Sequence, residues 1–228
     1  MSIFDLLNGS KTRLIDPAQA LPGRSEYAYP IPAMHAVLGS PIQGPFPADT
    51  EQLYLGMGCF WGAERKFWRM PGVLTTAVGY QGGFTPHPTY EEVCTGRTGH
   101  AENVLVVYCP EQTSTEEVLR TFWENHDPTT GYRQGNDVGT QYRSAVYCST
   151  PEQLALAQRT AETFGEVLTA DGWGPITTEI AMAGDKPFFY AEEFHQQYLH
   201  KVPNGYDCHS ATGLHLPPVE GEPPLRTV

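Results

Sequence analysis

The sequence predicts an α/β (α+β) fold, in the form of a single two-layer sandwich domain with a mixed sheet. Runs rich in β-branched and aromatic residues alternate with amphipathic runs of helical length. Several connections between them are too short for crossovers, so part of the sheet must pair antiparallel. The 228 residues suffice for one substantial core, and both ends differ in composition from the middle.

The strands are predicted from composition and the helices from their boundaries. Strand-like runs cover residues 52–57, 73–80, 103–109, 143–148 and 176–181. Helices are predicted over residues 59–70, 115–125, 151–168 and 190–200. Pro71 ends the first helix, and the second and third begin at the capping pairs Ser114 with Glu117 and Thr150 with Gln153. Strands and helices therefore alternate through the middle of the chain.

Both ends of the chain are rich in proline and show no sustained helical or strand period. Residues 1–50 contain seven prolines and residues 202–228 contain five. Such segments are typical of coil. We therefore expect a coil-rich N-terminal extension (1–50) packed on the core, a folded domain over 51–201 and a mobile C-terminal tail (202–228).

The charge and the cysteine content argue against several classes of protein. A formal charge of −12, with no dense block of basic residues, opposes a nucleic-acid partner. Neither an export signal nor a membrane span is visible, so we expect a soluble, cytoplasmic protein. The five cysteines are odd in number and form no CxxC pair, which argues against a disulfide framework and a zinc site. His195 and His200 are five residues apart, so we expect solvated helix residues and no metal.

Cys59 is the first candidate for a reactive residue. It lies in GCFWG (58–62), between the first predicted strand and the first predicted helix. A thiol in the first turn of a helix is close to unpaired N–H groups and to the positive end of the dipole, which favour the thiolate. The alternative is a buried cysteine that packs as a small hydrophobe. Phe60 and Trp61 either wall a small apolar pocket beside the thiol or pack in the core.

Four polar side chains are candidates to act with this thiol. Glu102 begins an apolar strand, so its carboxylate is expected at the mouth of a core strand; the alternative is a solvated strand end. Asp137 is either a site residue or a turn former. Tyr90 and Tyr142 lie in glycine-rich loops, where functional groups are often carried, or are packing residues with hydroxyls at the surface.

Seven motifs connect these candidates. They are GCFWGAE (58–64), GYQGG (79–83), PTYEEVC (88–94), TGHAE (98–102), FWENHDP (122–128), QGNDVGTQYRS (134–144) and HQQYLHK (195–201). Together they resemble the A-type peptide methionine sulfoxide reductases, in the order of that family, from about Leu21 to Pro218. The resemblance implies a two-layer α/β core and a thioredoxin-linked enzyme without a cofactor. Such an enzyme reduces the S epimer of methionine sulfoxide, free or in proteins, and so repairs oxidised proteins.

The resemblance also implies roles for single residues. It makes Cys59 the nucleophile and Glu102 the acid on the sulfoxide oxygen, with two tyrosines as hydrogen-bond donors and two adjacent aromatics around the substrate methyl. The positions around the substrate are Phe60, Trp61, Tyr90, Asp137, Tyr142 and Tyr198. The chemistry independently needs such groups, because a sulfoxide sulfur accepts a nucleophile only when its oxygen receives a proton or strong donors. The acid must be protonated near neutral pH, which requires a dry pocket.

The tail supplies the candidate for the second half of the reaction. Attack leaves Cys59 as a sulfenic acid, which a second thiol converts to a disulfide. Cys208 lies in the aperiodic tail, whereas three cysteines in or beside regular elements are expected to be structural: Cys94, Cys109 and Cys148. Relatives with a similar extension have two tail cysteines, and an ungapped match puts Asp207 and His215 at those positions. We therefore expect one disulfide, Cys59 to Cys208, reduced directly by thioredoxin.

An ionised Glu102 beside Cys59 would raise the pKa of the thiol, so we expect the two groups to share a proton and titrate as a coupled pair.

The residues alone leave three other functions open. A cysteine hydrolase or acyltransferase needs a histidine base, for which His100 is placed in a suitable loop. A module that binds oxidised methionine without catalysis, and a thiol peroxidase, are the other two.

Overall fold

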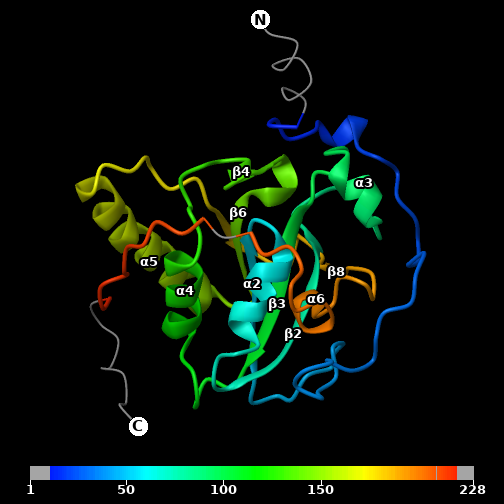
Figure 1. The fold of residues 1–228 in the computed structure, drawn as a ribbon, viewed down its shortest axis with the longest axis horizontal. Helices are drawn as coiled ribbons and strands as arrows, with labels where there is room; N and C mark the ends of the chain where they lie inside the picture. Colours follow the sequence, from blue (N-terminus) through cyan, green and yellow to red (C-terminus); the bar gives the residue numbers. More distant parts are fainter. Residues whose placement is uncertain (1–10, 209, 220–228) are drawn as a thin grey trace, which may run out of the picture.

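The computed structural model describes residues 11–208 and 210–219, and its central feature is a six-stranded mixed sheet (Figure 1). The strand order is β7-β6-β1-β3-β2-β8. The strands are β1 (Glu51–Met57), β2 (Val73–Gln81), β3 (Ala101–Tyr108), β6 (Ser144–Cys148), β7 (Glu179–Met182) and β8 (Phe189–Tyr190). β6 and β7 pair in parallel, and the other neighbours pair antiparallel. The predicted α/β fold with a mixed sheet is confirmed.

Three helices pack on one face of this sheet. They are α2 (Phe60–Phe67), α4 (Thr115–Glu124) and α5 (Pro151–Ala170). α4 and α5 begin at the capping boxes that the sequence predicts. Leu53 and Leu55 of β1, with Val104 and Val106 of β3, face these helices, because alternate residues of a strand point to the same side. The main core therefore lies between α2, α4, α5 and the two central strands.

The N-terminal segment covers the opposite face of the sheet. Leu105 and Val107 of β3 form a second buried cluster with Ile42, which has no exposed surface. The segment contains one short 3-10 helix, η1 (Pro17–Gln19), and runs along the side of the molecule that carries β8 (Figure 1). Residues 1–10 of the predicted extension lie outside the described residues. The described part of the extension thus supplies apolar contacts that the helices do not.

The predicted helix over residues 190–200 is wrong. Residues Phe189–Tyr190 form β8, and α6 covers only Tyr198–Lys201. The side chain of Gln196 accepts a hydrogen bond from Val78 N at 2.9 Å and donates one to Val78 O at 2.8 Å, so it continues the edge of β2. Gln197 then has a φ of 48°, which no regular helix permits. Tertiary contacts to β2 therefore prevail over the helical composition.

Four short elements lie in or beside stretches predicted as loops. α3 (Tyr90–Cys94) begins at a capping box of Thr89 and Glu92. This pair is a helix-start signal that is visible in the sequence. The glycine-rich stretch after residue 130 contains the hairpin β4 (Arg133–Gln134) with β5 (Asp137–Val138), and η2 (Thr140–Tyr142). These elements carry three of the candidate site residues.

The C-terminal segment crosses the helical face. In Figure 1 the orange and red part of the chain passes from α6 across α2 and α4. Leu216 is 2% exposed, and its N–H donates to Glu124 Oε1 at 2.9 Å. Residues 209 and 220–228 of the predicted tail lie outside the described residues. Within the described ranges, no helix has the length and apolar character that a membrane crossing needs.

Candidate active site

The turn between β1 and α2 positions Cys59. Gly58 has a φ of +86°, and a Cβ at this position would come within 2.5 Å of the Gln134 side chain. Glycine is therefore needed both for the turn and for the close approach to β4. Cys59 is the N-cap residue of α2, as the sequence predicts, but only 8% of it is exposed. The thiol thus lies at the start of a helix in a largely dry environment.

Glu102 lies beside the start of the same helix. It is the second residue of β3, where it pairs with Tyr80, and it is 1% exposed. The Phe60 N–H donates to Glu102 Oε2 at 3.0 Å. Burial raises the pKa of Glu102 to about 8 from an ordinary value of 4.5, although the bond from Phe60 opposes the rise. The alternative of a solvated strand end is wrong, and the carboxyl is mostly protonated at neutral pH.

The helix start favours the thiolate of Cys59, as expected, but other effects outweigh it. Burial raises the pKa of Cys59 well above its ordinary value of 9.0, and the nearby Glu102 carboxylate raises it further. The Trp61 N–H opposes these effects without outweighing them. Burial disfavours the charged form of both groups, and the Glu102 carboxylate disfavours the thiolate, so the site holds both protons at neutral pH. That the two groups titrate as a coupled pair stays a prediction.

Two tyrosines on different elements lie within electrostatic reach of the same carboxyl. Tyr90 is the first residue of α3, where its N–H donates to Glu192 Oε1 at 2.7 Å, and Tyr142 is the last residue of η2. Burial raises the pKa of both phenols, and in both the Glu102 carboxylate is the next cause. Both hydroxyls are therefore protonated donors close to Glu102. Tyr90 is also close to the Cys94 thiol, which was expected to be only structural.

Cys208 and Asp137 lie together at the edge of the site. The Cys208 Sγ donates to Gln134 O at 3.6 Å, and Tyr206 Oη donates to Asp137 Oδ1 at 3.1 Å. Burial, and then a hydrogen bond with Asp137, raise the pKa of the Cys208 thiol. Cys208 and Asp137 also contribute to the raised pKa of Cys59, so the tail brings its cysteine near the first thiol. All five cysteines are free.

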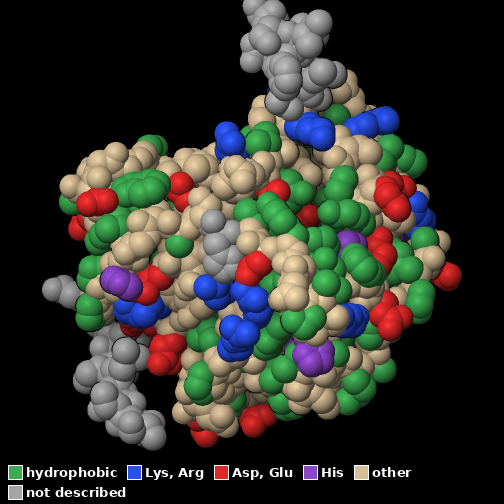
Figure 2. Space-filling model, viewed as in Figure 1, with side chains coloured by type: hydrophobic (Ala, Val, Ile, Leu, Met, Phe, Trp, Pro, Cys, Tyr) green, Lys and Arg blue, Asp and Glu red, His purple; other side chains and the backbone are tan. Residues whose placement is uncertain are grey.

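An ion pair ties the tail to α2. Arg65 of α2 binds Asp207, the residue before Cys208. Figure 2 shows Lys and Arg side chains gathered at the centre of this face, where Figure 1 places α2; Arg65 and Lys66 form its last turn. The hollow that Lys66 and Cys208 line has a volume of about 10 Å³, which is room for about one water molecule. The tail therefore fills the space beside α2.

Aromatic rings form one wall of the site. Trp61 is half-buried and stacks on Tyr198 with 3.9 Å between ring centroids, while Phe60 is 1% exposed and lies in the main core cluster. His195 is 5% exposed, so the expectation of a solvated helix residue is wrong. Its Nδ1 accepts a hydrogen bond from Trp61 Nε1 at 3.1 Å, and its ring lies 4.4 Å from that of Tyr90. His195 therefore connects Trp61 with Tyr90 in this wall. In the sequence, only its place in the HQQYLHK motif indicated a role for it.

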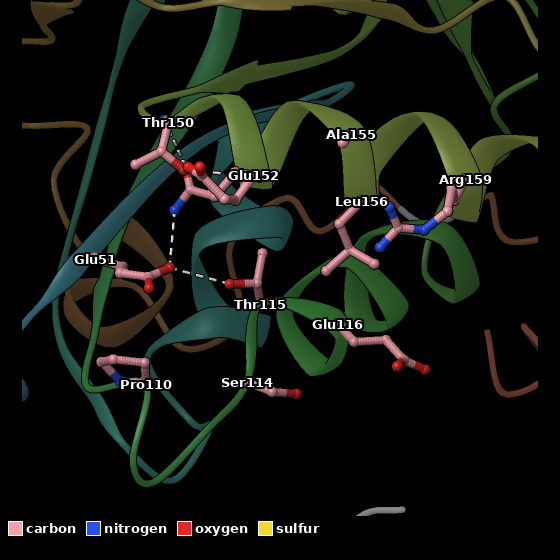
Figure 3. A pocket seen from close by; sticks show the side chains of 11 residues that line it. Glu51, Pro110, Ser114, Thr115, Glu116, Thr150, Glu152, Ala155, Leu156 and Arg159 are labelled. Atoms are coloured by element: carbon pink, nitrogen blue, oxygen red, sulfur yellow. Dashed lines mark hydrogen bonds between the residues drawn. The ribbon is translucent and has the colours of Figure 1, made fainter. Parts of the chain in front are cut away.

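Other features lie apart from these residues. A cavity of about 450 Å³ is found at the opposite end of β1, a strand of seven residues that spans about 20 Å (Figure 3). His100 is 2% exposed and is engaged with Gly83 N and Thr85 O, so it is not free to act as a base for Cys59. Over residues 11–208 and 210–219, no cluster of His, Cys, Asp and Glu is arranged to hold a metal.

The comparisons with known proteins agree on one family. A family model described as peptide methionine sulfoxide reductase matches residues 51–219. The peptide methionine sulfoxide reductase MsrA of Azotobacter vinelandii is 60% identical over 205 residues, which are 90% of this chain and 94% of that protein. The structure of methionine sulfoxide reductase A of Corynebacterium diphtheriae matches with a TM-score of 0.81 and 48% identity, over 90% of this chain and 100% of that one. Reduced Mxr1 of Saccharomyces cerevisiae matches with a TM-score of 0.64 and 34% identity, over 73% and 94% of the two chains.

Proposed function

Because the chain belongs to the peptide methionine sulfoxide reductase family, we propose that it is an oxidoreductase that reduces methionine sulfoxide. The S epimer, free or in proteins, is the proposed substrate. One observation supports this chemistry above the others: the buried Glu102 carboxyl is hydrogen-bonded to Phe60 N, next to Cys59. A thiol paired with a neutral carboxylic acid suits a reaction in which a nucleophile attacks while an oxygen is protonated.

In the proposed first step, Cys59 attacks the sulfur of the sulfoxide while Glu102 delivers a proton to its oxygen. Tyr90 and Tyr142 donate hydrogen bonds to the same oxygen, which accumulates negative charge as the sulfur–oxygen bond weakens. The oxygen passes to Cys59, which becomes a sulfenic acid, and methionine leaves, reduced by two electrons. Substrate binding is proposed to keep the proton on Glu102 until attack. As Glu102 gives this proton to the oxygen, it takes the proton of the Cys59 thiol, so Cys59 reacts as the thiolate and Glu102 ends protonated. The raised pKa values, which keep a proton on each group before attack, support this arrangement.

In the proposed second step, the Cys208 thiol attacks the sulfenic sulfur. Water leaves, a disulfide joins Cys59 and Cys208, and a dithiol of the thioredoxin type then returns both cysteines to thiols. The position of Cys208 against Gln134 and Asp137 supports its role as the resolving cysteine. The tail contains no second cysteine. His215, which an ungapped match puts at the position of the second tail cysteine of similar proteins, pairs with Glu124.

The substrate is proposed to bind against the aromatic wall. Trp61 and Phe60 are proposed to surround the methyl group, and the stacking of Tyr198 on the Trp61 ring supports this arrangement. Asp137 is proposed to orient polar groups at the edge next to Cys208. No part of this chemistry requires a cofactor or a metal.

The wider role proposed for the protein is repair after oxidation, in the cytoplasm. Five free thiols suit a reducing compartment, and neither a membrane nor a nucleic acid is a proposed partner. We retain the proposed division into an extension (1–50), a catalytic domain (51–201) and a tail with the resolving cysteine (202–228).

The experiment that tests the function is a reductase assay on the separated S and R epimers, with dithiothreitol as reductant. We expect methionine from the S epimer and none from Cys59→Ser. A peroxidase would consume peroxide much faster than sulfoxide, a hydrolase would cleave an ester or amide, and a binding module would retain affinity in Cys59→Ser and release no methionine. Undiminished conversion by Cys59→Ser would refute the proposal.

A further inference from the structure

A second buried carboxylate lies on α2, and the proposed chemistry does not use it. Glu64 has no exposed surface, although it belongs to the helix that begins at Cys59. It accepts hydrogen bonds from Thr76 Oγ1 at 2.9 Å, from Gln197 Nε2 at 2.7 Å and from Gln197 N at 2.8 Å. Burial raises the pKa of Glu64 to about 7, and the hydrogen bonds from Gln197 and Thr76 oppose the rise, so these donors compensate the buried carboxyl.

The hydrogen bonds of this network all point toward Glu64. His35 of the N-terminal segment accepts at Nδ1 from Val37 N and Leu38 N, so its proton lies on Nε2. His35 Nε2 therefore donates to Thr76 Oγ1 at 2.8 Å, which leaves the hydroxyl proton of Thr76 for Glu64 Oε1. Burial lowers the pKa of His35 to about 4, in agreement with a neutral ring. Glu64 thus acts as the final acceptor of the chain.

Gln197 is the strained member of the network. Its φ of 48° is one of two positive values among the non-glycine residues described. Such a conformation persists only where the surroundings enforce it. Two of the three bonds to Glu64 come from Gln197, and its Oε1 accepts from Ala36 N at 3.2 Å. Glu64 of α2 and Ala36 of the N-terminal segment therefore hold this part of the backbone together.

The neighbours of Gln197 form the aromatic wall. Tyr198, the next residue, stacks on Trp61, and His195, two residues before, accepts from the Trp61 indole. We propose that Glu64 is a positioning residue for the substrate pocket: with residues 35–36 it holds Gln197 in the left-handed conformation, and so fixes the Tyr198 and His195 rings against Trp61. This inference rests on the proposed function, and it gives the N-terminal segment a part in substrate binding.

The direct test is Glu64→Gln, which keeps the shape but offers one acceptor oxygen in place of two. The new amide can take two orientations. In one, its NH₂ faces the Gln197 N–H; in the other, it faces the Thr76 hydroxyl and the Gln197 side-chain amide. In both, a donor faces a donor. Gln197 cannot turn its own amide without losing the bond from Ala36 N. Because a buried donor of Gln197 or Thr76 is left without its acceptor, we expect the substrate concentration for half-maximal methionine release in a single turnover to rise about ten-fold. The maximal rate should change less, because Cys59 and Glu102 keep their contacts.

Glu51→Gln is the matched control. Its Oε2 also accepts three side-chain hydrogen bonds, from Tyr108, Thr115 and Gln153, at the far end of β1 (Figure 3 draws the one from Thr115). We expect Glu51→Gln to lower stability without weakening substrate binding. A second readout is the NMR signal of the Trp61 indole N–H, which should shift in Glu64→Gln and stay in place in Glu51→Gln.

Three results would overturn the inference. The first is an unchanged half-saturation concentration and indole signal in Glu64→Gln, and the second is an equal effect in Glu51→Gln. The third applies if Glu64→Gln fails to fold: it is unchanged substrate binding in Gln197→Ala, which removes the side-chain amide together with the methylene that carries it. A wild-type protein that reduces neither epimer would instead refute the proposed function, and the indole signal would still decide whether Glu64 positions the wall.

Discussion

Replacing Glu102 by glutamine should make the protein inactive and, with rising pH, more stable than the wild type. The carboxyl is 1% exposed, and burial holds its pKa at about 8 in the folded state, against 4.5 ordinarily. Between these values the unfolded chain is ionised while the folded protein keeps its proton. The folded state then binds more protons than the unfolded state, so the contribution of Glu102 to stability falls as pH rises.

The size of the effect follows from the shift. A difference of about 3.5 pKa units corresponds to about 5 kcal/mol of lost stability once the pH exceeds the folded pKa. Between about pH 5 and pH 8 the loss should grow by about 3 kcal/mol. The glutamine variant does not titrate there, so its stability relative to wild type should rise by that amount. Its methionine release should fall by about 10²- to 10⁴-fold, because the amide cannot deliver a proton.

The assay is urea unfolding of both proteins at several values across this pH range, with methionine release measured on the same samples. Glu152→Gln removes an exposed carboxyl and controls for the loss of one negative charge from a chain of net charge −12. We expect its stability difference from wild type to change little with pH. If the free energies of unfolding of wild type and Glu102→Gln run parallel across this pH range, the carboxyl is ionised in the folded protein and the reasoning is refuted.

Three further predictions concern the thiols. The pH profile for alkylation of Cys59 should move to lower pH in Glu102→Gln, because the carboxylate raises the pKa of this thiol; indistinguishable profiles would count against coupling. Cys208→Ser should stall after it releases one equivalent of methionine without reductant, and mass mapping of the wild type should find Cys59 joined to Cys208; another pairing would contradict the resolving role. Arg65→Ala should slow formation of this disulfide by less than about five-fold, because the Arg65–Asp207 pair is partly exposed and such pairs contribute under about 1 kcal/mol; a loss above a hundred-fold would show that the pair is essential.

The fold was predictable where local signals and packing agree. The capping boxes at Ser114 and Thr150 set the starts of α4 and α5, and the runs of β1, β2 and β3 were found within two residues of their bounds. The helix predicted over 190–200 failed because its polar residues bond to groups far away in the sequence. Gln196 binds the backbone of Val78, and Gln197 binds Glu64. No local pattern contains those partners.

The sequence alone determined which residues are the candidates for the chemistry, because a nucleophile, an acid and donors are residue types that motifs reveal. It also determined that one tail cysteine is present, at position 208. Only the tertiary structure decided their protonation and their neighbours. It shows that Glu102 is buried enough to keep its proton, that the pKa of the Cys59 thiol is raised, and that His195 belongs to the aromatic wall with Trp61. The reason is physical, since pKa values and ring positions depend on burial and contacts between segments that are distant in the chain.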